Sequence, residues 1–203
     1  MSTFSKSRLE ALSDGVFAIA MTLLVLELKV PALPKGSAPA EIWAALGHDA
    51  LGFLGFAMSF LLAGYFWILQ HEVFRQLKDA DRRLAPLTLF YLLFVSLLPF
   101  STSMLTHFGL RDQVALIWYL GNFWVLSALL ALKWRVARAS ASLHEVSIDR
   151  VQRVSERMMY AMPFVLLIPI AAVFVAPAAA IRFLWISMIV TGFIARRRVA
   201  RAA

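Results

Sequence analysis

The sequence predicts an all-α membrane protein with six transmembrane helices that form one domain over residues 1–203. Of the 203 residues, 61% are hydrophobic and only 16% are charged, whereas a soluble domain usually carries about 25% charged residues. The hydrophobic residues gather in long runs, and the chain is long enough for six spans of about 20 residues each. The alternating pattern of transmembrane β-strands is absent, so helices are the expected way to satisfy backbone hydrogen bonds in lipid.

The first predicted span covers about residues 8–30. A polar segment that contains Arg8, Ser13 and Asp14 opens it, and an almost uninterrupted apolar run follows. Glu10 and Asp14 argue against a cleaved signal peptide, in which only positive charge precedes the apolar run. Ionisable groups at the end of a membrane helix are costly to place there and usually have a function.

Five further spans are predicted from apolar runs that turn-forming or charged segments separate. In the second span, Gly55, Ser59 and Ala63 recur at every fourth residue, which favours close packing of another helix. Asn122 lies in the middle of the fourth span, and Pro177 divides a last apolar run that is too long for one helix. The five spans are about 45–77, 84–106, 113–134, 159–176 and 179–195.

The basic residues predict the orientation of the chain. With a cytoplasmic amino terminus, 16 of the 20 lysines and arginines, Lys133 among them, fall in cytoplasmic segments. This asymmetry follows the positive-inside rule, so the net charge of +8 needs no nucleic acid partner. Six spans return the carboxyl terminus to the cytoplasm. The four outside residues are Lys29, Lys35, Arg111 and Arg182.

The sequence carries no recognisable enzyme signature. It contains no G-x-S-x-G, no HExxH and no phosphate-binding glycine loop. Cysteine is absent, and the four histidines are scattered along the chain. We therefore expect neither an enzyme nor a metal cluster, and no organic substrate or resident cofactor.

Polar residues on the first two spans can meet near the cytoplasmic side. The two spans run antiparallel, so Ser13 and Asp14 can approach Trp67 and His71 on the second span. A hydrogen-bonded cluster of these groups would satisfy atoms that are costly to leave unpaired. The cluster can be a staple that only fixes packing, or a support that orients the first helix around a pore.

The apolar part of the first span has a distinct face. At about 100° per residue, Ile19, Leu23 and Leu26 form one stripe with Thr22 at its border. Any buried helix shows such a face, so the pattern alone fits packing as well as pore lining. Glu27, just beyond the stripe, can attract cations at an outer mouth or simply be solvated.

The first span also resembles a known family. The motif RxxxLSD from Arg8 to Asp14, followed by GVFAI and TLLVLE, resembles the signature first helix of bacterial relatives of the lysosomal potassium channel, the transmembrane protein 175 family. Trp67 and His71, four residues apart in the second span, also resemble the pattern of this family. The family hallmark is Phe-Ser-Asp, and here Leu12 replaces the phenylalanine, which loses an aromatic contact but keeps bulk and apolarity.

The resemblance implies a homotetramer in the bacterial inner membrane, with each chain contributing its first helix to a central pore. Ile19, five residues after Asp14, matches the narrowest point of the family's pore. Thr22 matches a threonine layer implicated in ion selection, and Leu23 and Leu26 match further apolar pore positions.

We therefore expect a potassium-selective or potassium-preferring, leak-type channel whose only metal is the permeating potassium ion. The sequence has no TVGYG-type loop, so selectivity cannot come from a ring of backbone carbonyls. The resemblance implies instead a hydrophobic constriction of four Ile19 side chains, which would gate by dewetting. The main alternative is a proton-coupled secondary transporter or proton pathway in which Asp14 and His71 carry protons. A transporter favours internal symmetry or broken helices near the midplane, and the first span has no break. A third alternative, an assembly protein, would tolerate any apolar residue in the Ile19 stripe.

Overall fold

The computed structural model describes residues 5–77, 83–139 and 159–187, and its elements in these ranges are helices. Four helical segments are long and apolar enough to cross a membrane by length and composition: Lys6–Glu27, Ala50–Gln76, Leu84–Phe108 and Gln113–Ala139. This confirms the all-α membrane class. Two shorter apolar helices cover Met159–Val175 and Pro177–Ser187. The predicted sixth span runs to residue 195, and its last part lies outside the described residues.

The first span consists of α1 (Lys6–Leu23) and a tighter 3-10 turn, η1 (Leu24–Glu27). The backbone becomes extended at Leu28, two residues before the predicted end at residue 30. Two nearby prolines, Pro31 and Pro34, explain the extended path, because proline lacks an N–H and disfavours a helical residue before it.

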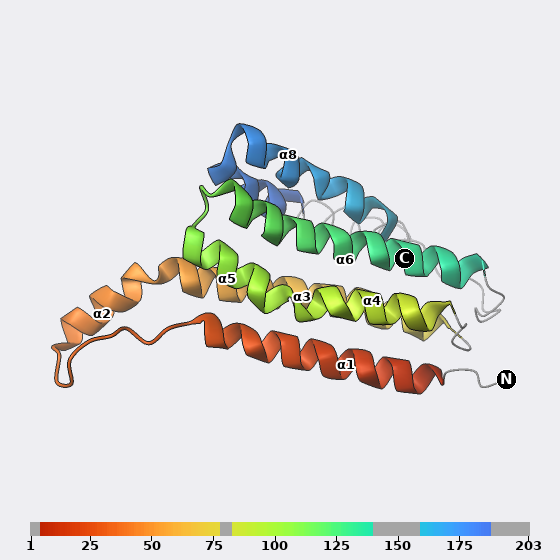
Figure 1. Cartoon of the computed structure of the whole chain (residues 1–203), viewed down its shortest axis with the longest axis horizontal. Coiled ribbons are helices and arrows are strands. Elements are labelled where there is room, and N and C mark those ends of the chain that lie inside the picture. The colour runs from red at the N-terminus through yellow and green to blue at the C-terminus, as the bar shows by residue number, and fades with distance from the viewer. Residues whose placement is uncertain (1–4, 78–82, 140–158, 188–203) are drawn as a thin grey trace, which may run out of the picture.

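The predicted second span begins too early. Residues 45–48 belong to a separate helix, α2 (Pro39–His48), and α3 (Ala50–Gln76) starts after a break at Asp49. Pro39 occupies the first turn of α2, and the Glu41 carboxylate accepts the Ala38 N–H at 3.1 Å, which are helix-start signals. α2 buries no residue and extends beyond the end of α1 (Figure 1).

Two helices share the predicted span 84–106. α4 (Leu84–Ser96) and α5 (Leu98–Phe108) meet at Leu97, because Pro99 has no N–H to continue the hydrogen-bond ladder. The long helix α6 (Gln113–Ala139) continues five residues past the predicted boundary at residue 134. In the last part of the chain, a turn at Leu166 precedes α8 (Leu167–Val175).

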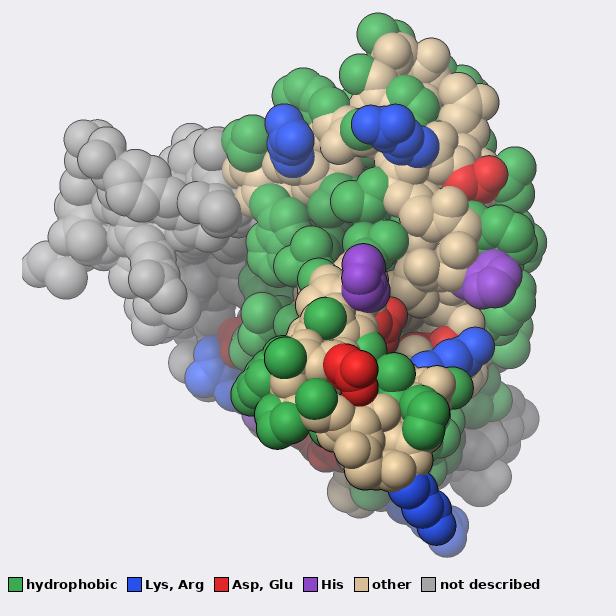
Figure 2. Space-filling view, turned by 90° about the vertical axis from the view of Figure 1, so that its left-hand side faces the viewer, with side chains coloured by type: hydrophobic (Ala, Val, Ile, Leu, Met, Phe, Trp, Pro, Cys, Tyr) green, Lys and Arg blue, Asp and Glu red, His purple; other side chains and the backbone are tan. Residues whose placement is uncertain are grey.

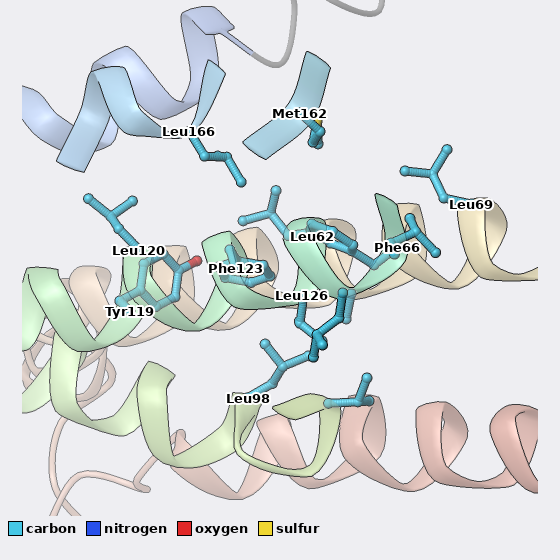
Figure 3. Close-up of a cluster of buried hydrophobic side chains, with 14 of the residues drawn as sticks. Leu62, Phe66, Leu69, Leu98, Tyr119, Leu120, Phe123, Leu126, Met162 and Leu166 are labelled. Carbon is cyan, nitrogen blue, oxygen red and sulfur yellow. The ribbon is translucent and has the colours of Figure 1, made fainter. Parts of the chain in front are cut away.

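The helices form a layered bundle with α1 on one edge and α8 on the other (Figure 1). α1 packs against α3, α4 and α5, while α6 packs against α3, α4, α5 and α8. Aromatic rings fill the centre: Phe66 of α3 stacks on Phe123 of α6 at 5.7 Å, and Tyr119 meets Phe123 edge-on at 5.1 Å (Figure 3). In lipid such packing, rather than exclusion of water, holds helices together.

The small-residue face of α3 lies in the interior. Gly55, Ser59 and Ala63 are all buried. The Ser59 hydroxyl lies 2.8 Å from the Thr102 hydroxyl of α5 and 3.1 Å from the Tyr119 hydroxyl of α6. The small side chains therefore allow a three-helix polar contact inside an apolar bundle.

Gly55 provides a test of this packing. A Cβ atom at Gly55 would lie 2.5 Å from the Cγ2 atom of Thr106, whereas one at Gly121 would meet nothing within 4 Å. We expect Gly55→Ala to lower the melting temperature by about 2 to 10 °C, since overpacking costs about 1–3 kcal/mol. The matched control Gly121→Ala should leave it within experimental error. Thermal unfolding of the purified protein in detergent measures both variants, and equal melting temperatures would contradict the close approach of α3 and α5.

Candidate functional site

α1 has one face docked on the bundle and one face that no described residue covers. The four predicted pore residues share the second face, which we call the outer face of α1. Its Ile19 is 60% exposed, Leu23 42% and Leu26 70%, and Thr22 is exposed as well. The docked face consists of Leu9, Ser13, Phe17, Ala20 and Leu24. An apolar surface of this kind on a membrane helix must meet either lipid or another protein surface.

The Thr22 hydroxyl is already committed to its own helix. Its oxygen lies 2.9 Å from the carbonyl oxygens of Ala18 and Ile19, which is a common bond for threonine inside a helix. A hydroxyl has only one proton to donate. Toward any group outside the helix, the Thr22 oxygen is therefore an acceptor, as coordination of a cation requires.

Two polar contacts tie α1 to α3 on the outside of the bundle. The Trp67 Nε1–H donates a hydrogen bond of 2.8 Å to Asp14 Oδ1. One turn further along both helices, His71 Nδ1 lies 3.5 Å from Glu10 Oε1. We call these four residues the polar staple. The Trp67 and His71 rings lie 6.0 Å apart, so the staple forms a continuous strip across the two helices.

The structure brings Asp14 and Trp67 together but changes the partner of His71. The sequence predicts one cluster of His71 with Asp14, Ser13 and Trp67, whereas the acid that lies beside His71 is Glu10. The reason is the antiparallel register, in which residue 14 faces residue 67 and residue 10 faces residue 71. Glu10 and Asp14 have the same four-residue spacing as Trp67 and His71, so the second pair was readable from the sequence.

Two other members of the predicted network lie outside the staple. Ser13 is buried, and its hydroxyl donates to the Leu9 carbonyl at 2.8 Å within α1. Arg8 is exposed, and among the described residues its side chain makes no hydrogen bond or ion pair. A third contact, which the sequence analysis missed, extends the helix pair by another turn: Lys6 Nζ donates to the Leu77 carbonyl at the end of α3, at 2.8 Å.

The structure also buries a lysine that the sequence analysis had counted among the residues of cytoplasmic segments. Lys133 of α6 is 1% exposed, and its Nζ donates to Gln70 Oε1 of α3 at 2.7 Å. The same ammonium lies 5.0 Å from the ring centre of Phe74 and 4.9 Å from that of Tyr91, a geometry suited to cation–π attraction. Lys133 therefore ties α6 to α3 in the interior of the bundle, whereas the staple lies on its outside.

Glu27 lies at the end of η1, on the end of the bundle that carries α2. η1 packs against α3 and α5, and in the described part of the chain no hydrogen bond or ion pair fixes the Glu27 carboxylate. Figure 2 looks onto this end and shows acidic, basic and histidine side chains spread among hydrophobic ones. One chain alone does not form a concentrated acidic mouth there.

The part of the chain that carries the outer face of α1 and the polar staple also matches known proteins. Residues 8–99, which run from the first turn of α1 to the start of α5, match the family model described as endosomal/lysosomal potassium channel TMEM175. A potassium channel of Streptomyces collinus is 35% identical over 159 residues, which cover 76% of this chain and 75% of that one. The human endosomal/lysosomal proton channel TMEM175 is 34% identical over 114 residues, which are 54% of this chain but 23% of that protein.

The fold agrees with a solved structure. The crystal structure of a lysosomal potassium-selective channel TMEM175 homologue from Chamaesiphon minutus matches with a TM-score of 0.72 and 27% identity, over 97% of each chain. The resemblance inferred from the first span is thereby confirmed, and the coarse description of a multi-pass membrane protein follows. On its first-helix signature, its family model and its similarity to the Streptomyces channel, this chain belongs to the TMEM175 family of ion channels.

Proposed function

We propose that this protein is a potassium-preferring, leak-type channel of the bacterial inner membrane, with both termini in the cytoplasm. In this proposal four chains assemble, and the α1 helices line a central pore. One observation carries it: the outer face of α1 is exposed while the opposite face is docked on the bundle. The Streptomyces relative is named a potassium channel and the Chamaesiphon homologue potassium-selective, which supports the choice of ion.

Helical geometry spaces the side chains of the outer face along the proposed pore. With about 1.5 Å of rise per residue, Thr22 lies about 4.5 Å beyond Ile19, and Leu26 about 10 Å beyond it. Four copies of Ile19 around the axis would form an apolar ring, which blocks ions by dewetting until it widens. The proposed constriction is therefore Ile19, with Leu23 and Leu26 continuing the apolar wall toward the outer mouth at Glu27.

Ion preference is assigned to Thr22. Four threonine oxygens that act only as acceptors can replace part of the water around a passing cation. Potassium loses less hydration energy than the smaller sodium ion when it is partly dehydrated, so partial compensation favours potassium. Because such a ring has few ligands compared with a carbonyl filter, the expected selectivity is modest.

The polar staple supports the pore in this proposal. It fixes the rotation and the height of α1 relative to α3, so that Ile19 and Thr22 face the axis. Rotation of α1 by one residue would move both side chains by about 100°. Asp14, Trp67, Glu10 and His71 are then positioning residues that contact no ion.

The proton pathway remains the second candidate, and the name of the human relative, a proton channel, favours it. His71 and Asp14 would have to exchange protons in that case. The described contacts offer no direct relay, because Asp14 accepts from Trp67 and His71 lies beside Glu10. The Asp14 carboxylate instead accepts the hydrogen bond of the Trp67 indole N–H.

Ile19→Ala tests the constriction. We expect a several-fold larger single-channel conductance in a planar bilayer under a potassium–sodium gradient, because the apolar ring is widened. Ile68→Ala of α3 is the matched control, since Ile68 is 58% exposed against 60% for Ile19. An equal increase in both variants, or no current in any of the proteins, would contradict a pore lined by α1.

Thr22→Val tests ion selection with almost no change in shape. Valine keeps the branched side chain and removes the oxygen, so the reversal potential should move toward zero under the same gradient. Thr22→Ser retains the hydroxyl and should keep the potassium preference. An unchanged reversal potential in the valine variant would show that the Thr22 oxygen does not determine the potassium preference.

Asp14→Asn and Asp14→Leu separate the staple from the proton pathway. Asparagine still offers an oxygen to Trp67 Nε1–H, so it should keep most of the potassium current and stability. Leucine leaves the indole N–H unpaired and should lower both. Potassium and proton fluxes into vesicles are measured side by side. If Asp14→Asn, but not the wild type, lacked a proton flux while the protein stayed folded, Asp14 would carry protons rather than position α1. That outcome would favour the proton pathway over the potassium channel.

A further inference from the structure

Two arginines share one pocket at the end of the bundle that carries α2. The pocket has a volume of about 400 Å³, and it is lined by Arg111, Arg182 and the segment 176–179. Arg111 lies in the turn between α5 and α6, and Arg182 lies in the helix Pro177–Ser187. No residue of α1 lines the pocket, so it is separate from the proposed pore.

Helix breaks on both sides make the room between the two arginines. α8 ends at Val175, and the backbone of Ala176 leaves the helical region with φ −148° and ψ 76°. Pro177 then starts the next helix, as proline commonly does in a first turn. On the other side, Gly109 ends α5 with a positive φ of 86°, which favours glycine, and the turn that follows carries Arg111. The alanines of the segment 176–179 contribute only methyl groups, so they leave the pocket open.

The positive charge at the pocket is not balanced. Both arginines are exposed, and within residues 5–77, 83–139 and 159–187 neither guanidinium has a hydrogen bond or an ion pair. The acid next to Arg111, Asp112, accepts the Ala115 N–H at 2.8 Å and thereby caps α6. Each guanidinium offers five N–H donors, and no acidic side chain lines the pocket. The pocket is therefore suited to an anion.

An apolar surface leads away from the pocket along the bundle. Ile186 lies one turn after Arg182 on the same side of the helix, and it is exposed, as are Phe183 and Val175. Figure 2 shows this end of the bundle, where basic side chains lie next to hydrophobic ones. In a membrane protein, a surface that combines free cations with exposed apolar side chains at a helix end lies where lipid headgroups meet acyl chains.

We propose that the pocket binds an anionic phospholipid, with the phosphate between Arg111 and Arg182 and the acyl chains along the exposed apolar side chains. Arginine suits this role because its planar guanidinium can hold two phosphate oxygens at once. Basic pockets between membrane helices bind anionic headgroups in this way.

Other occupants fit less well. A zwitterionic lipid also carries a phosphate, but its ammonium group would meet two guanidinium groups of the same charge. A soluble anion would use the arginines and leave the neighbouring apolar surface without a partner. Both surfaces of a membrane carry phosphate groups, so the proposal holds for either orientation of the chain. It also does not depend on which ion the channel conducts.

Native mass spectrometry of the purified assembly in detergent tests the proposal, because a neutral micelle lacks the charged surface of a bilayer. Phosphatidylglycerol and phosphatidylcholine with the same acyl chains are added separately, and the dissociation constants of the first bound lipid are compared. We expect the wild type to bind phosphatidylglycerol about five- to thirtyfold more tightly, at about fivefold for each arginine. The same spectra report the number of chains in the assembly.

Two double variants separate a defined site from general attraction. Arg111→Gln combined with Arg182→Gln should bring the two lipids to within about twofold of each other. Lys29→Gln combined with Lys35→Gln removes the same charge from exposed residues at the same end and should keep the wild-type preference. Ala178→Leu keeps both arginines but fills part of the pocket, so it should also weaken the binding of phosphatidylglycerol.

Equal binding of both lipids to the wild type would overturn the proposal, as would an equal loss of preference in the lysine variant. Competition by glycerol 3-phosphate at the same concentration as the lipid would assign the pocket to a soluble anion instead. A changed number of chains in the arginine variant, with unchanged lipid binding, would overturn the proposal by assigning the arginines to a contact between chains. None of these measurements uses ion current, so their failure is distinct from a failure of the proposed channel function.

Discussion

The attachment of α1 to α3 is the contact on which the rest of the proposed mechanism depends. Between helices in lipid there is little hydrophobic driving force, because the acyl chains are as apolar as leucine. Directional contacts therefore decide how a helix is rotated. The Asp14–Trp67 contact and the Glu10–His71 contact lie on successive turns of the two helices. The hydrogen bond from Lys6 to the Leu77 carbonyl adds a third contact at the end of α3. Three contacts along one side of α1 fix its rotation far better than any single bond could.

The fixed rotation leaves an apolar face of the first span that the described residues do not cover. The same helix buries Phe17 and Leu24 almost completely and exposes Ile19 and Leu26. Exposure to lipid alone would explain the leucines and isoleucine, but it gives no role to Thr22. Assembly around an axis explains all four side chains together. It would also gather copies of Glu27 at one end, where a single chain shows only scattered charges (Figure 2).

Much of the fold was predictable from the sequence, because apolar runs and helix breakers act locally. The division at Pro177 and the face of α1 depend only on neighbouring residues. Contacts between helices depend on register, which the sequence does not state. Hence the contact of Asp14 with Trp67 was expected, while Glu10 as the neighbour of His71 was not. The burial of Lys133 was not predicted either, because the sequence does not show that Gln70 and two aromatic rings surround a cation near the end of an apolar run.

The polar side chains inside the spans fall into three groups, and the differences are informative. Ser13 and Thr22 donate their hydroxyl protons to carbonyl groups of their own helix. Trp67 and Lys133 bond across helices and thereby set the arrangement of the bundle. Asn122 bonds across helices with its nitrogen only, and its Oδ1 atom has no partner among the described residues. Gln70 Nε2 and Thr88 Oγ1 are also unpaired among the described residues. Because the bilayer core contains no water to satisfy it, the unpaired Asn122 oxygen is costly where it lies, and the α5 helix that Asn122 contacts through Ser101 also packs against α1.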